Sequence, residues 1–368
     1  MKVALVHDWL NTKFGGGENV LVELAAMFPD APIYTLLYDR EVCGDAIDPE
    51  RVRPSVLQRS PKFLQRRPRY LLPLIPMAIE QFDLSEYDLV ISTSSAWAKG
   101  VITQPETLHV CYCFAPMRFV WDYWPAYVEE QRVGWLRRAA IYVLTSRLRL
   151  WDYYSAARVD RWVPISHCVA KRIQKYYRQP TAPVIYPGAD LAAFAPSATH
   201  SDYFVTLASL TPYKKIDLAI AACNRLGKRL VVIGDGTDRA RLQKLAGPTI
   251  EFAGRVDSTR RAQLVAQAQA LIFPNEEDFG IAPIEAMASG TPVIGYGRGG
   301  LTETVVPGTT GVLFEEPTVE SLAVAITAFR REDYATADLT AQATKFSNQV
   351  FRQKFQDYIE KADHEYRT

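Results

Sequence analysis

Short apolar runs rich in β-branched residues alternate along this chain with longer stretches of helical periodicity. Such alternation is typical of a parallel β-sheet covered by helices on both faces, because a strand buried on both faces has no polar side. The predicted strands are Val3–His7, Ile33–Leu37, Leu89–Ser92, His109–Phe114, Trp162–Ile165, Phe204–Leu207, Arg229–Ile233, Ile250–Ala253, Ala270–Phe273 and Pro292–Gly295. We therefore expect an α/β protein with two open sheets.

The length of the chain, 368 residues, favours two domains over a single core. A segment rich in proline and glycine, residues 179–188, separates the two sets of strands and is the best linker candidate. We predict a first domain over residues 1–187 and a second over residues 188–349, both Rossmann-like. A last helix, at about residues 350–368, is expected to pack back on the first domain.

Composition excludes some classes of function. The formal net charge of +1 provides no field that would attract nucleic acid. The five cysteines are scattered and match no zinc spacing, which fits a reducing cytoplasm. No apolar segment reaches the length of a membrane span, so any membrane contact is expected to be peripheral.

One region interrupts the alternation of strands and helices. The Arg51–Arg69 region contains seven cations and no acid, and the apolar segment Tyr70–Met77 follows it directly. A second basic and aromatic stretch runs from Arg132 to Arg149. Basic residues beside apolar ones suit an anionic membrane surface. We hypothesise peripheral attachment to the inner face of the plasma membrane; two ordinary surface helices with solvated faces are the alternative.

The strongest chemical signal lies at residues 273–294, FPNEEDFGIAPIEAMASGTPVI, where seven residues separate Glu277 from Glu285. The pattern predicts a buried strand, an acidic loop, and a helix that begins near Pro283 and carries Glu285 in its first turn. Ligands of parallel α/β sheets bind at such junctions. Two carboxylates here favour a ligand rich in hydroxyls, such as a sugar and a ribose. A surface loop with an acidic helix start is the alternative.

Two other junctions between a strand and a helix are candidate ligand sites. Gly15, Gly16 and Gly17 follow the first strand, where backbone amides can approach a ligand without obstruction, although such a triplet also makes a flexible turn. Lys214 follows the first strand of the second half. A cation there can neutralise a diphosphate leaving group, whereas an ordinary solvated lysine is the alternative.

These motifs, in this order, resemble the E-x7-E signature and nucleotide-binding loops of the family 4 retaining glycosyltransferases, with a nearly continuous match from Thr206 to Phe314. The resemblance implies the GT-B fold, two facing Rossmann-like domains with the active site in the interdomain cleft. It assigns acceptor binding to the first domain and nucleotide-sugar binding to the second. It implies catalytic roles for Lys214 and Glu277. The implied donor-binding residues are Gly15, Gly16, Gly17, Gly234, Arg255, Val256, Phe279, Gly280, Ile281 and Glu285, the last through the ribose.

The chain departs from the family pattern in both halves. An arginine expected near Lys214 is Ser209, and Lys215 and Arg255 are the candidate substitutes. A histidine expected at the end of a strand is Phe114, and a second one is missing from the segment Ser94-Ser95-Ala96. His7 and His109 are the candidates to replace them, with core or capping roles as the alternative for His7. Lys99 and Arg118 are retained as candidate acceptor-binding residues.

The function implied is transfer of a hexose from a nucleotide-sugar, UDP-glucose before GDP-mannose. The expected acceptor is a saccharide or polyprenyl-linked saccharide in bacterial exopolysaccharide or envelope polysaccharide biosynthesis. Because no D-x-D sequence occurs, we expect no metal and no cofactor. Retention is expected through same-face substitution, in which the departing diphosphate takes the acceptor's proton. A UDP-sugar epimerase of the same fold and a non-catalytic nucleotide-sugar-binding protein are the alternatives.

Overall fold

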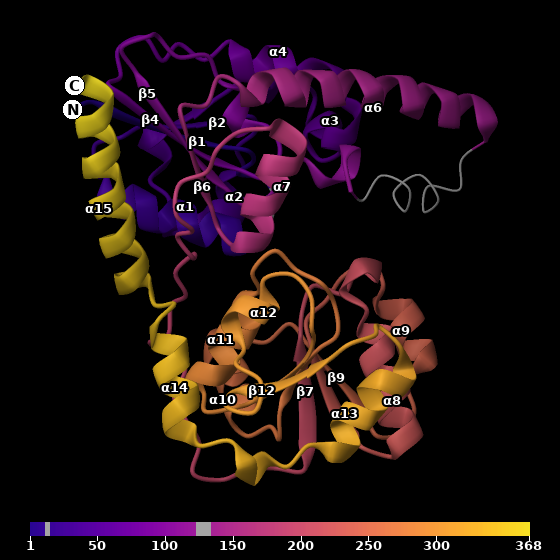
Figure 1. Ribbon diagram of the computed structural model, residues 1–368. Coiled ribbons are helices and arrows are strands. Elements are labelled where there is room, and N and C mark those ends of the chain that lie inside the picture. The colour runs from indigo at the N-terminus through magenta and orange to yellow at the C-terminus, as the bar shows by residue number, and fades with distance from the viewer. Residues whose placement is uncertain (12–14, 123–133) are drawn as a thin grey trace. The chain divides into compact units, whose positions relative to one another are not determined.

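A computed structural model describes residues 1–11, 15–122 and 134–368, without the side chains of residues 136 and 137. The contacts divide the chain into two compact units (Figure 1). Unit 1 comprises Met1–Tyr186 and Arg352–Thr368, and unit 2 comprises Pro187–Phe351. Each unit contains a six-stranded parallel sheet, which confirms the predicted α/β class. Residues 12–14, and Arg132 at the start of the second basic stretch, lie outside the described residues.

The sheet of unit 1 has the strand order β3-β2-β1-β4-β5-β6. Its strands are β1 (Val3–His7), β2 (Ile33–Thr35), β3 (Val52–Pro54), β4 (Leu89–Ser94), β5 (Leu108–Cys113) and β6 (Arg161–Pro164). The sequence pattern missed the edge strand β3, because Val52 is the only one of its three side chains that is buried. The other five agree with the prediction to within a few residues at their ends.

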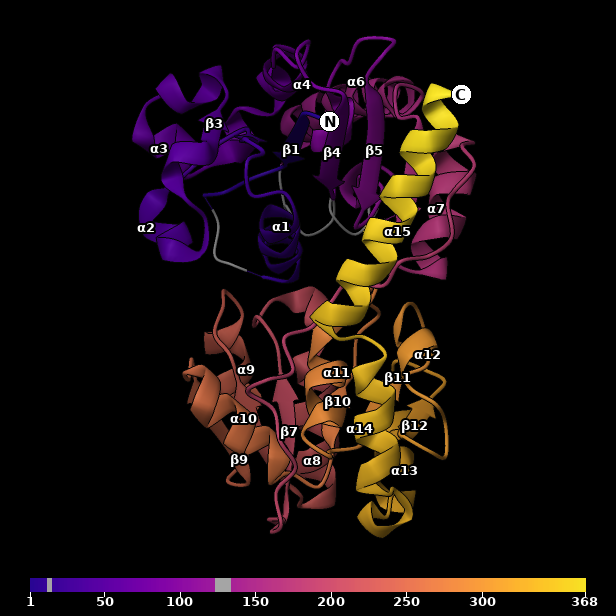
Figure 2. The same cartoon turned by 90° about the vertical axis from the view of Figure 1, so that its left-hand side faces the viewer.

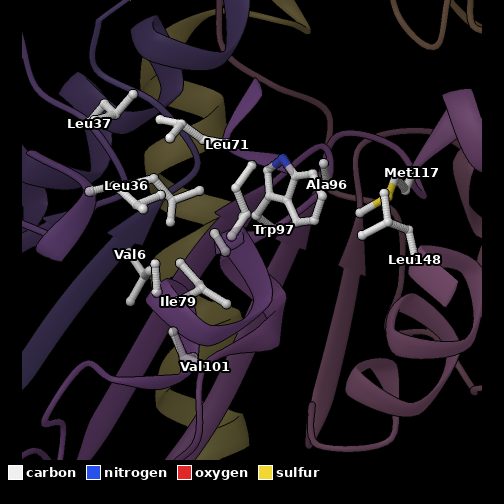
Figure 3. Close-up of a cluster of buried hydrophobic side chains, with 14 of the residues drawn as sticks. Val6, Leu36, Leu37, Leu71, Ile79, Ala96, Trp97, Val101, Met117 and Leu148 are labelled. Carbon is white, nitrogen blue, oxygen red and sulfur yellow. The ribbon is translucent and has the colours of Figure 1, made fainter. Parts of the chain in front are cut away.

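Helices cover both faces of the sheet in unit 1 (Figures 1 and 2). They are α1 (Gly16–Met27), α2 (Arg40–Cys43), α3 (Lys62–Gln65), α4 (Ile75–Glu80), α6 (Trp135–Ala156), α7 (His167–Tyr177) and α15 (Asn348–Arg367). Figure 3 shows the buried cluster around Trp97, to which Val6 of β1, Ile79 of α4 and Leu148 of α6 belong. Alternate residues of β1 face this cluster, as the two-residue period of a strand requires.

The helix α15 begins at Asn348, and its residues from Arg352 onward belong to unit 1. Within unit 1, the ring of Phe355 packs against that of Tyr112 on β5, with centroids 5.7 Å apart. The hydroxyl of Tyr366 donates to the carbonyl oxygen of Pro105 at 2.7 Å. Figure 2 shows this helix running beside β5.

Unit 2 has the strand order β12-β11-β10-β7-β8-β9. Its strands are β7 (Tyr203–Leu207), β8 (Arg229–Ile233), β9 (Ile250–Gly254), β10 (Leu271–Phe273), β11 (Val293–Tyr296) and β12 (Gly311–Phe314). Its helices are α8 (Ile216–Leu226), α9 (Arg239–Leu245), α10 (Ser258–Ala266), α11 (Ile281–Ala288), α12 (Leu301–Thr304), α13 (Val319–Ala328) and α14 (Thr336–Thr344). The strand β12 was not predicted, because its start at Gly311 continues a run of threonine and glycine that is typical of a turn.

Both sheets reverse their winding direction at one point. In unit 1 the chain proceeds from β1 outward to β2 and β3, and then returns to β4 on the other side of β1. In unit 2 it proceeds from β7 to β8 and β9, and then returns to β10. Ligands of open α/β sheets bind beyond the carboxyl ends of the strands at such a reversal. We therefore expect the ligand site of unit 2 at the loops after β7 and β10.

The structure corrects one part of the predicted basic region. Arg51 is half-buried, and its guanidinium donates to the carbonyl oxygens of Ala25, Phe28 and Ala31 at 3.1, 2.7 and 3.0 Å. These carbonyls lie at and after the end of α1, where the last carbonyl groups of a helix lack partners within the helix. Arg51 therefore belongs to the internal hydrogen bonding of unit 1 and not to a surface that binds lipid.

Candidate active site

The reversal point of unit 2 brings together two residues that lie 63 positions apart in the sequence. Lys214 lies in the turn Pro212–Lys214 after β7, and Glu277 lies in the loop after β10. Because β7 and β10 are neighbours, their carboxyl ends place these two loops side by side. The Lys214 ammonium contacts the Glu277 carboxylate in an ion pair, with 16 and 19% of the side chains exposed. The two residues predicted to be catalytic are thus in contact, and both remain partly open to solvent.

Glu277 is held from both its side chain and its backbone. Buried Asn275 donates from its side-chain amide to Glu277 Oε1 at 3.0 Å. The carbonyl oxygen of Glu277 accepts the backbone N–H of Gly300 at 2.8 Å. Gly299, at φ +65°, pairs with Glu277 in an isolated parallel bridge, and a Cβ atom there would overlap the Glu277 carbonyl. The loop after β10 is therefore fixed by the glycine-rich loop after β11.

The Lys214 ammonium is mostly buried and lies near two acidic side chains and an aromatic ring. Burial lowers the pKa of its ammonium to about 8, and the charge of Asp278 acts against this lowering. Its Nζ atom lies 5.1 Å from the ring centroid of Tyr213, a cation–π contact. The next residue, Lys215, has φ +53° and forms the N-cap of α8, a conformation that non-glycine residues seldom adopt. Lys214, which is paired with Glu277 and partly exposed, can exchange that carboxylate for a diphosphate.

Glu285 lies two residues further into α11 than predicted. The helix begins at Ile281 and not near Pro283, because Gly280, at φ +91°, is its N-cap. Pro283 is the third helical residue, where its missing N–H would have no partner within the helix. Glu285 is 8% exposed, and burial raises its pKa to about 7. Arg261 of α10 approaches Glu285 Oε1 to 3.3 Å and lowers this pKa, whereas Asp190 raises it further.

The other predicted donor-binding residues of unit 2 are distributed over three loops. Gly234 follows β8 with φ +132°, and its backbone passes so close to Ala208 that any side chain would overlap the Ala208 carbonyl. Arg255 is exposed and Val256 half-buried in the loop after β9. Around the start of α11, Phe279 is buried against Phe346, Gly280 is buried, and Ile281 is half-buried.

In unit 1, the glycine triplet forms the start of α1. Gly15 precedes the helix and donates its N–H to Glu18 at 2.8 Å, and Gly16 is the first helical residue. A Cβ atom on Gly17 would lie 3.3 Å from the ring of Phe114. The phenylalanine that stands in place of the expected histidine therefore packs against the amino-terminal turn of α1.

The reversal point of unit 1 contains a carboxylate that the sequence analysis missed. Asp8 follows β1 and accepts the backbone N–H groups of residues 95–98, after β4, at 2.6–2.9 Å. Four successive backbone donors are the usual partners of a bound anion. Here the chain itself supplies that anion, which fixes the Ser94-Ser95-Ala96 segment.

The two candidate acceptor-binding residues are both engaged within unit 1. Lys99 is 2% exposed, and its ammonium donates to Asp152 at 2.5 Å and to the carbonyl oxygen of Ala96 at 2.6 Å. Arg118 lies 3.5 Å from Asp122 and is about one-third exposed. The structure therefore corrects the expectation for Lys99, because a buried ammonium with an internal carboxylate partner is closed to an acceptor. Arg118 remains accessible.

The two candidate histidines are both buried, whereas the two candidate cations are exposed. His109 lies inside the sheet, where its Nε2 shares a hydrogen bond with Ser92 at 2.8 Å and burial lowers its pKa to about 4. His7, at the carboxyl end of β1, shares a hydrogen bond with Thr93 through Nδ1 at 2.7 Å. Position thus favours His7 over His109. Lys215 and Arg255 are both exposed, so neither is excluded as a partner of phosphate.

Two residues of the unit 2 site were missed from the sequence, Asn275 and Arg261. Asn275 comes two residues after β10, a position that points to the carboxyl edge of the sheet. Arg261 carries no comparable signal, because it lies inside a helix beside other polar residues. In the part of the chain that the structure describes, no three His, Cys, Asp or Glu side chains are grouped so that they could hold a metal ion.

Comparison with known proteins identifies the family. The model for Glycosyltransferase Family 4 matches residues 14–193, and the model for Glycosyl transferases group 1 matches residues 192–346. A glycogen synthase of Mycobacterium tuberculosis is 35% identical over 144 residues, which cover 36% of this chain and 34% of that protein. A GDP-mannose-dependent alpha-mannosyltransferase of Mycolicibacterium smegmatis is 30% identical over 182 residues, which cover 45% of this chain and 47% of that protein. The chain thus spans less than half of the length of these two relatives.

Solved structures share the fold over nearly the whole chain. Anabaena HepE in complex with UDP superposes with a TM-score of 0.71 at 16% identity, covering 98% of this chain and all of that one. The sucrose-phosphate synthase of Thermosynechococcus elongatus gives 0.72 at 17% identity, covering 98 and 99%. At such identities the likeness concerns the fold alone. Together with two family models that span residues 14–346, it shows that the chain belongs to glycosyltransferase family 4 and has the GT-B fold.

Proposed function

We propose that this protein transfers a hexose, with retention of configuration, from a nucleotide-sugar to a saccharide or lipid-linked saccharide acceptor. The observation that carries this proposal is the contact between Lys214 and Glu277 at the reversal point of unit 2. A cation and a carboxylate there supply the two groups that a nucleotide-sugar requires, one for the diphosphate and one for sugar hydroxyls. We assign donor binding to unit 2 and acceptor binding to unit 1.

The diphosphate has further partners beside Lys214. The backbone N–H groups at the start of α11, next to Gly280, have no partners within the helix and suit phosphate oxygens. When a diphosphate enters, Lys214 turns from Glu277 to the phosphate, and the Glu277 carboxylate accepts hydrogen bonds from the sugar. Asn275 keeps the carboxylate in place during this exchange.

The stereochemical course follows from the same arrangement. Retention by double displacement would require a nucleophilic carboxylate at the anomeric carbon. Glu277 is already committed to hydroxyl binding in our proposal, which favours same-face substitution. The bond from the anomeric carbon to the diphosphate breaks, the acceptor oxygen forms the new bond on the same face, and the acceptor's proton passes to the departing diphosphate. Lys214 stabilises the charge that develops on that diphosphate. No step needs a metal.

For the donor we propose GDP-mannose, with UDP-glucose as the alternative. Relatives named for GDP-mannose include a mannosyltransferase of Mycobacterium tuberculosis at 33% identity and the one of Mycolicibacterium smegmatis at 30%. The structural neighbour with bound UDP is only 16% identical, which supports the fold and not the donor. We therefore reverse the order of donors expected from the sequence. A role in bacterial exopolysaccharide or envelope polysaccharide assembly remains part of this proposal.

Titration calorimetry with GDP and UDP tests the donor assignment. We expect GDP to bind at least about tenfold more tightly than UDP, a difference of about 1.4 kcal/mol. The variant Glu285→Gln should weaken both nucleotides equally, because both carry the same ribose. Tighter binding of UDP would favour UDP-glucose. Equal binding by Glu285→Gln and the wild type would remove the ribose role from Glu285.

We also propose that unit 1 has a surface that binds anionic membranes. The exposed cations of the predicted basic region are Arg53, Arg59, Lys62, Arg66, Arg67 and Arg69. Large apolar side chains are exposed among them, namely Val56, Phe63, Tyr70, Leu74 and Met77, with 44–65% of each accessible. No acid occurs between residues 51 and 79. We call residues 53–77 the basic–apolar surface. Its composition supports attachment to anionic lipid.

The helix α6 adds support for membrane attachment. Trp135 and Tyr154 are 77 and 69% exposed, and the only acidic residue of the helix, Asp152, is buried. Aromatic side chains suit the boundary between lipid headgroups and acyl chains. Within the described residues, no helix has the length and apolar character needed to cross a membrane. The attachment that we propose is peripheral.

Sedimentation with lipid vesicles tests this surface. We expect binding to vesicles that contain phosphatidylglycerol, weak binding to pure phosphatidylcholine, and release at high salt. Phe63→Ser combined with Arg66→Glu should abolish binding. Val324→Ser is the matched control, because Val324 of unit 2 is 69% exposed but lies outside the surface. Equal binding by the wild type and the double variant would contradict the proposal.

A further inference from the structure

Arg261 stands in an unusual position for a charged side chain. It lies on α10, and its guanidinium carbon is 5.3 Å from the ring centroid of Phe194. One terminal nitrogen is 3.3 Å from Oε1 of Glu285. The Glu285 side chain is 10% exposed and that of Arg261 is 34% exposed. The ring, the guanidinium and the carboxylate thus form a contiguous cluster within unit 2.

The arrangement is not explained by stability. The Nε atom of Arg261 is buried and, among the described residues, has no hydrogen-bond partner. An unsatisfied buried donor costs about 1–3 kcal/mol. An ion pair that lies partly inside a protein is often no more stable than apolar side chains of the same size. An apolar residue at position 261 would pack on Phe194 without this cost, so packing alone does not account for the arginine.

The role of Arg261 follows from its effect on the charge of its partner, Glu285. Glu285 is buried in α11, and two charged groups act on it: Arg261 from α10 and Asp190 from the segment before β7. Asp190 disfavours the ionised carboxylate, as burial does. Arg261 is the group that opposes them. An ionised carboxylate can accept hydrogen bonds from two ribose hydroxyls, whereas a protonated one has less accepting capacity.

We infer that Arg261 is a positioning residue for the donor nucleotide: it keeps the Glu285 carboxylate ionised and oriented so that it can accept the ribose hydroxyls. The contact with Phe194 holds the guanidinium in place, so that the ion pair is formed before the nucleotide arrives. This inference rests on the proposed role of Glu285. It adds a residue to the donor site that does not itself touch the donor.

The pH dependence of nucleotide binding tests this inference. We would measure the dissociation constant of GDP by calorimetry from pH 6 to pH 9 for the wild type, Arg261→Met, Arg261→Lys and Arg260→Met. Comparing each variant with the wild type at the same pH cancels the titration of Lys214. Arg260→Met is the matched control, because Arg260 is the exposed neighbour on the same helix.

For Arg261→Met we expect about fivefold weaker binding than the wild type at pH 7, which corresponds to a rise of about one unit in the pKa of Glu285 from its value of about 7. The difference should fall to less than about threefold at pH 9, where Glu285 is ionised in both proteins. Arg261→Lys should restore most of the affinity at pH 7, and Arg260→Met should match the wild type at every pH. Recovery at pH 9 would also show that the variant is folded.

Two results would overturn the inference about Arg261. The first is weaker binding by Arg261→Met in equal proportion at every pH, which indicates a packing role. The second is unchanged binding throughout. Failure of the proposed function is distinguishable from both, because the wild type would then bind neither GDP nor UDP, or Glu285→Gln would bind as tightly as the wild type.

Discussion

At the scale of single residues, the proposed site of unit 2 consists of charged side chains held in partly buried positions. Lys214 and Glu277 are in contact, and Glu285 is paired with Arg261. Burial disfavours the charged forms of Lys214 and Glu285. Such groups respond strongly to a ligand of opposite charge and to pH. Their titration therefore reports on the proposed roles more directly than loss of activity alone.

Lys214 should set the alkaline limit of activity. Its pKa is lowered to about 8, so its ammonium is charged below that pH and loses its charge as the pH rises through it. We expect kcat/KM to fall above about pH 8, because kcat/KM reports groups of the free enzyme. In Lys214→Arg, whose guanidinium stays charged, this fall should move to higher pH. The same alkaline limit in both proteins would assign it to another group.

Lys214→Ala distinguishes leaving-group stabilisation from simple binding. If the ammonium acts mainly as the diphosphate departs, kcat should fall by more than the donor's dissociation constant rises. We expect a loss of about a hundredfold or more in kcat, of the size seen when one stabilising donor is removed from other active sites. A variant that only binds the donor more weakly would indicate uniform binding.

Glu285 should also make stability depend on pH. Burial raises its pKa from 4.5 to about 7, so the folded protein binds more protons than the unfolded chain between these values. Its contribution to the free energy of unfolding therefore falls as the pH rises from 4.5 to 7 and is constant above. We expect Glu285→Gln to match the wild type near pH 4.5 and to be about 1–3 kcal/mol more stable at pH 8. Urea unfolding at both pH values measures this; equal stability at pH 8 would contradict it.

At the scale of elements, two loops from neighbouring strands form the core of the site. The loop after β11 supports the loop after β10 through Gly299 and Gly300. Neither glycine has a side chain that could act chemically. They permit a backbone approach that fixes Glu277.

Gly299→Ala tests this support against a matched control. Gly299 and Gly308 have φ angles of +65 and +75°, but only a Cβ at Gly299 would overlap Glu277, whereas nothing lies within 4 Å of one at Gly308. Both alanine variants should lose about 1–2 kcal/mol through their backbone conformation. Only Gly299→Ala should also weaken donor binding, by about tenfold or more. Equal donor affinity of the two variants, measured by calorimetry, would show that the loop is not fixed in this way.

An element can be predicted from the sequence when neighbouring residues alone determine it. β1 and β8 have the predicted bounds, because a buried strand between helices has a continuous apolar pattern. The start of α11 was predicted two residues late, because Pro283 resembles a first helical residue while the cap is Gly280. The Asp8 carboxylate and the Arg261–Glu285 pair could not be predicted, because each joins residues from different elements whose approach is set by the packing of the whole unit.

At the scale of the whole molecule, both sheets are parallel and both reverse their winding direction once. The side chains at the two reversal points differ. In unit 1 the backbone donors after β4 are taken by Asp8, and Lys99 is closed by Asp152. In unit 2 the corresponding position holds Lys214 and Glu277, which are accessible to a ligand. This difference supports the assignment of the donor diphosphate to unit 2. The family pattern alone predicted that assignment, but not the internal pairing of Asp8 and Lys99 in unit 1.

The central claim is that unit 2 activates a nucleotide-sugar through Lys214 without a metal. The most direct test is to incubate the purified protein with GDP-mannose, UDP-glucose and other nucleotide-sugars in the presence of EDTA, and to measure released nucleoside diphosphate by chromatography. Slow release from one donor, unchanged by EDTA and reduced about a hundredfold or more in Lys214→Ala, is the result that our account predicts. Release that EDTA abolishes, release that Lys214→Ala leaves unchanged, or conversion to a different free nucleotide-sugar would contradict it.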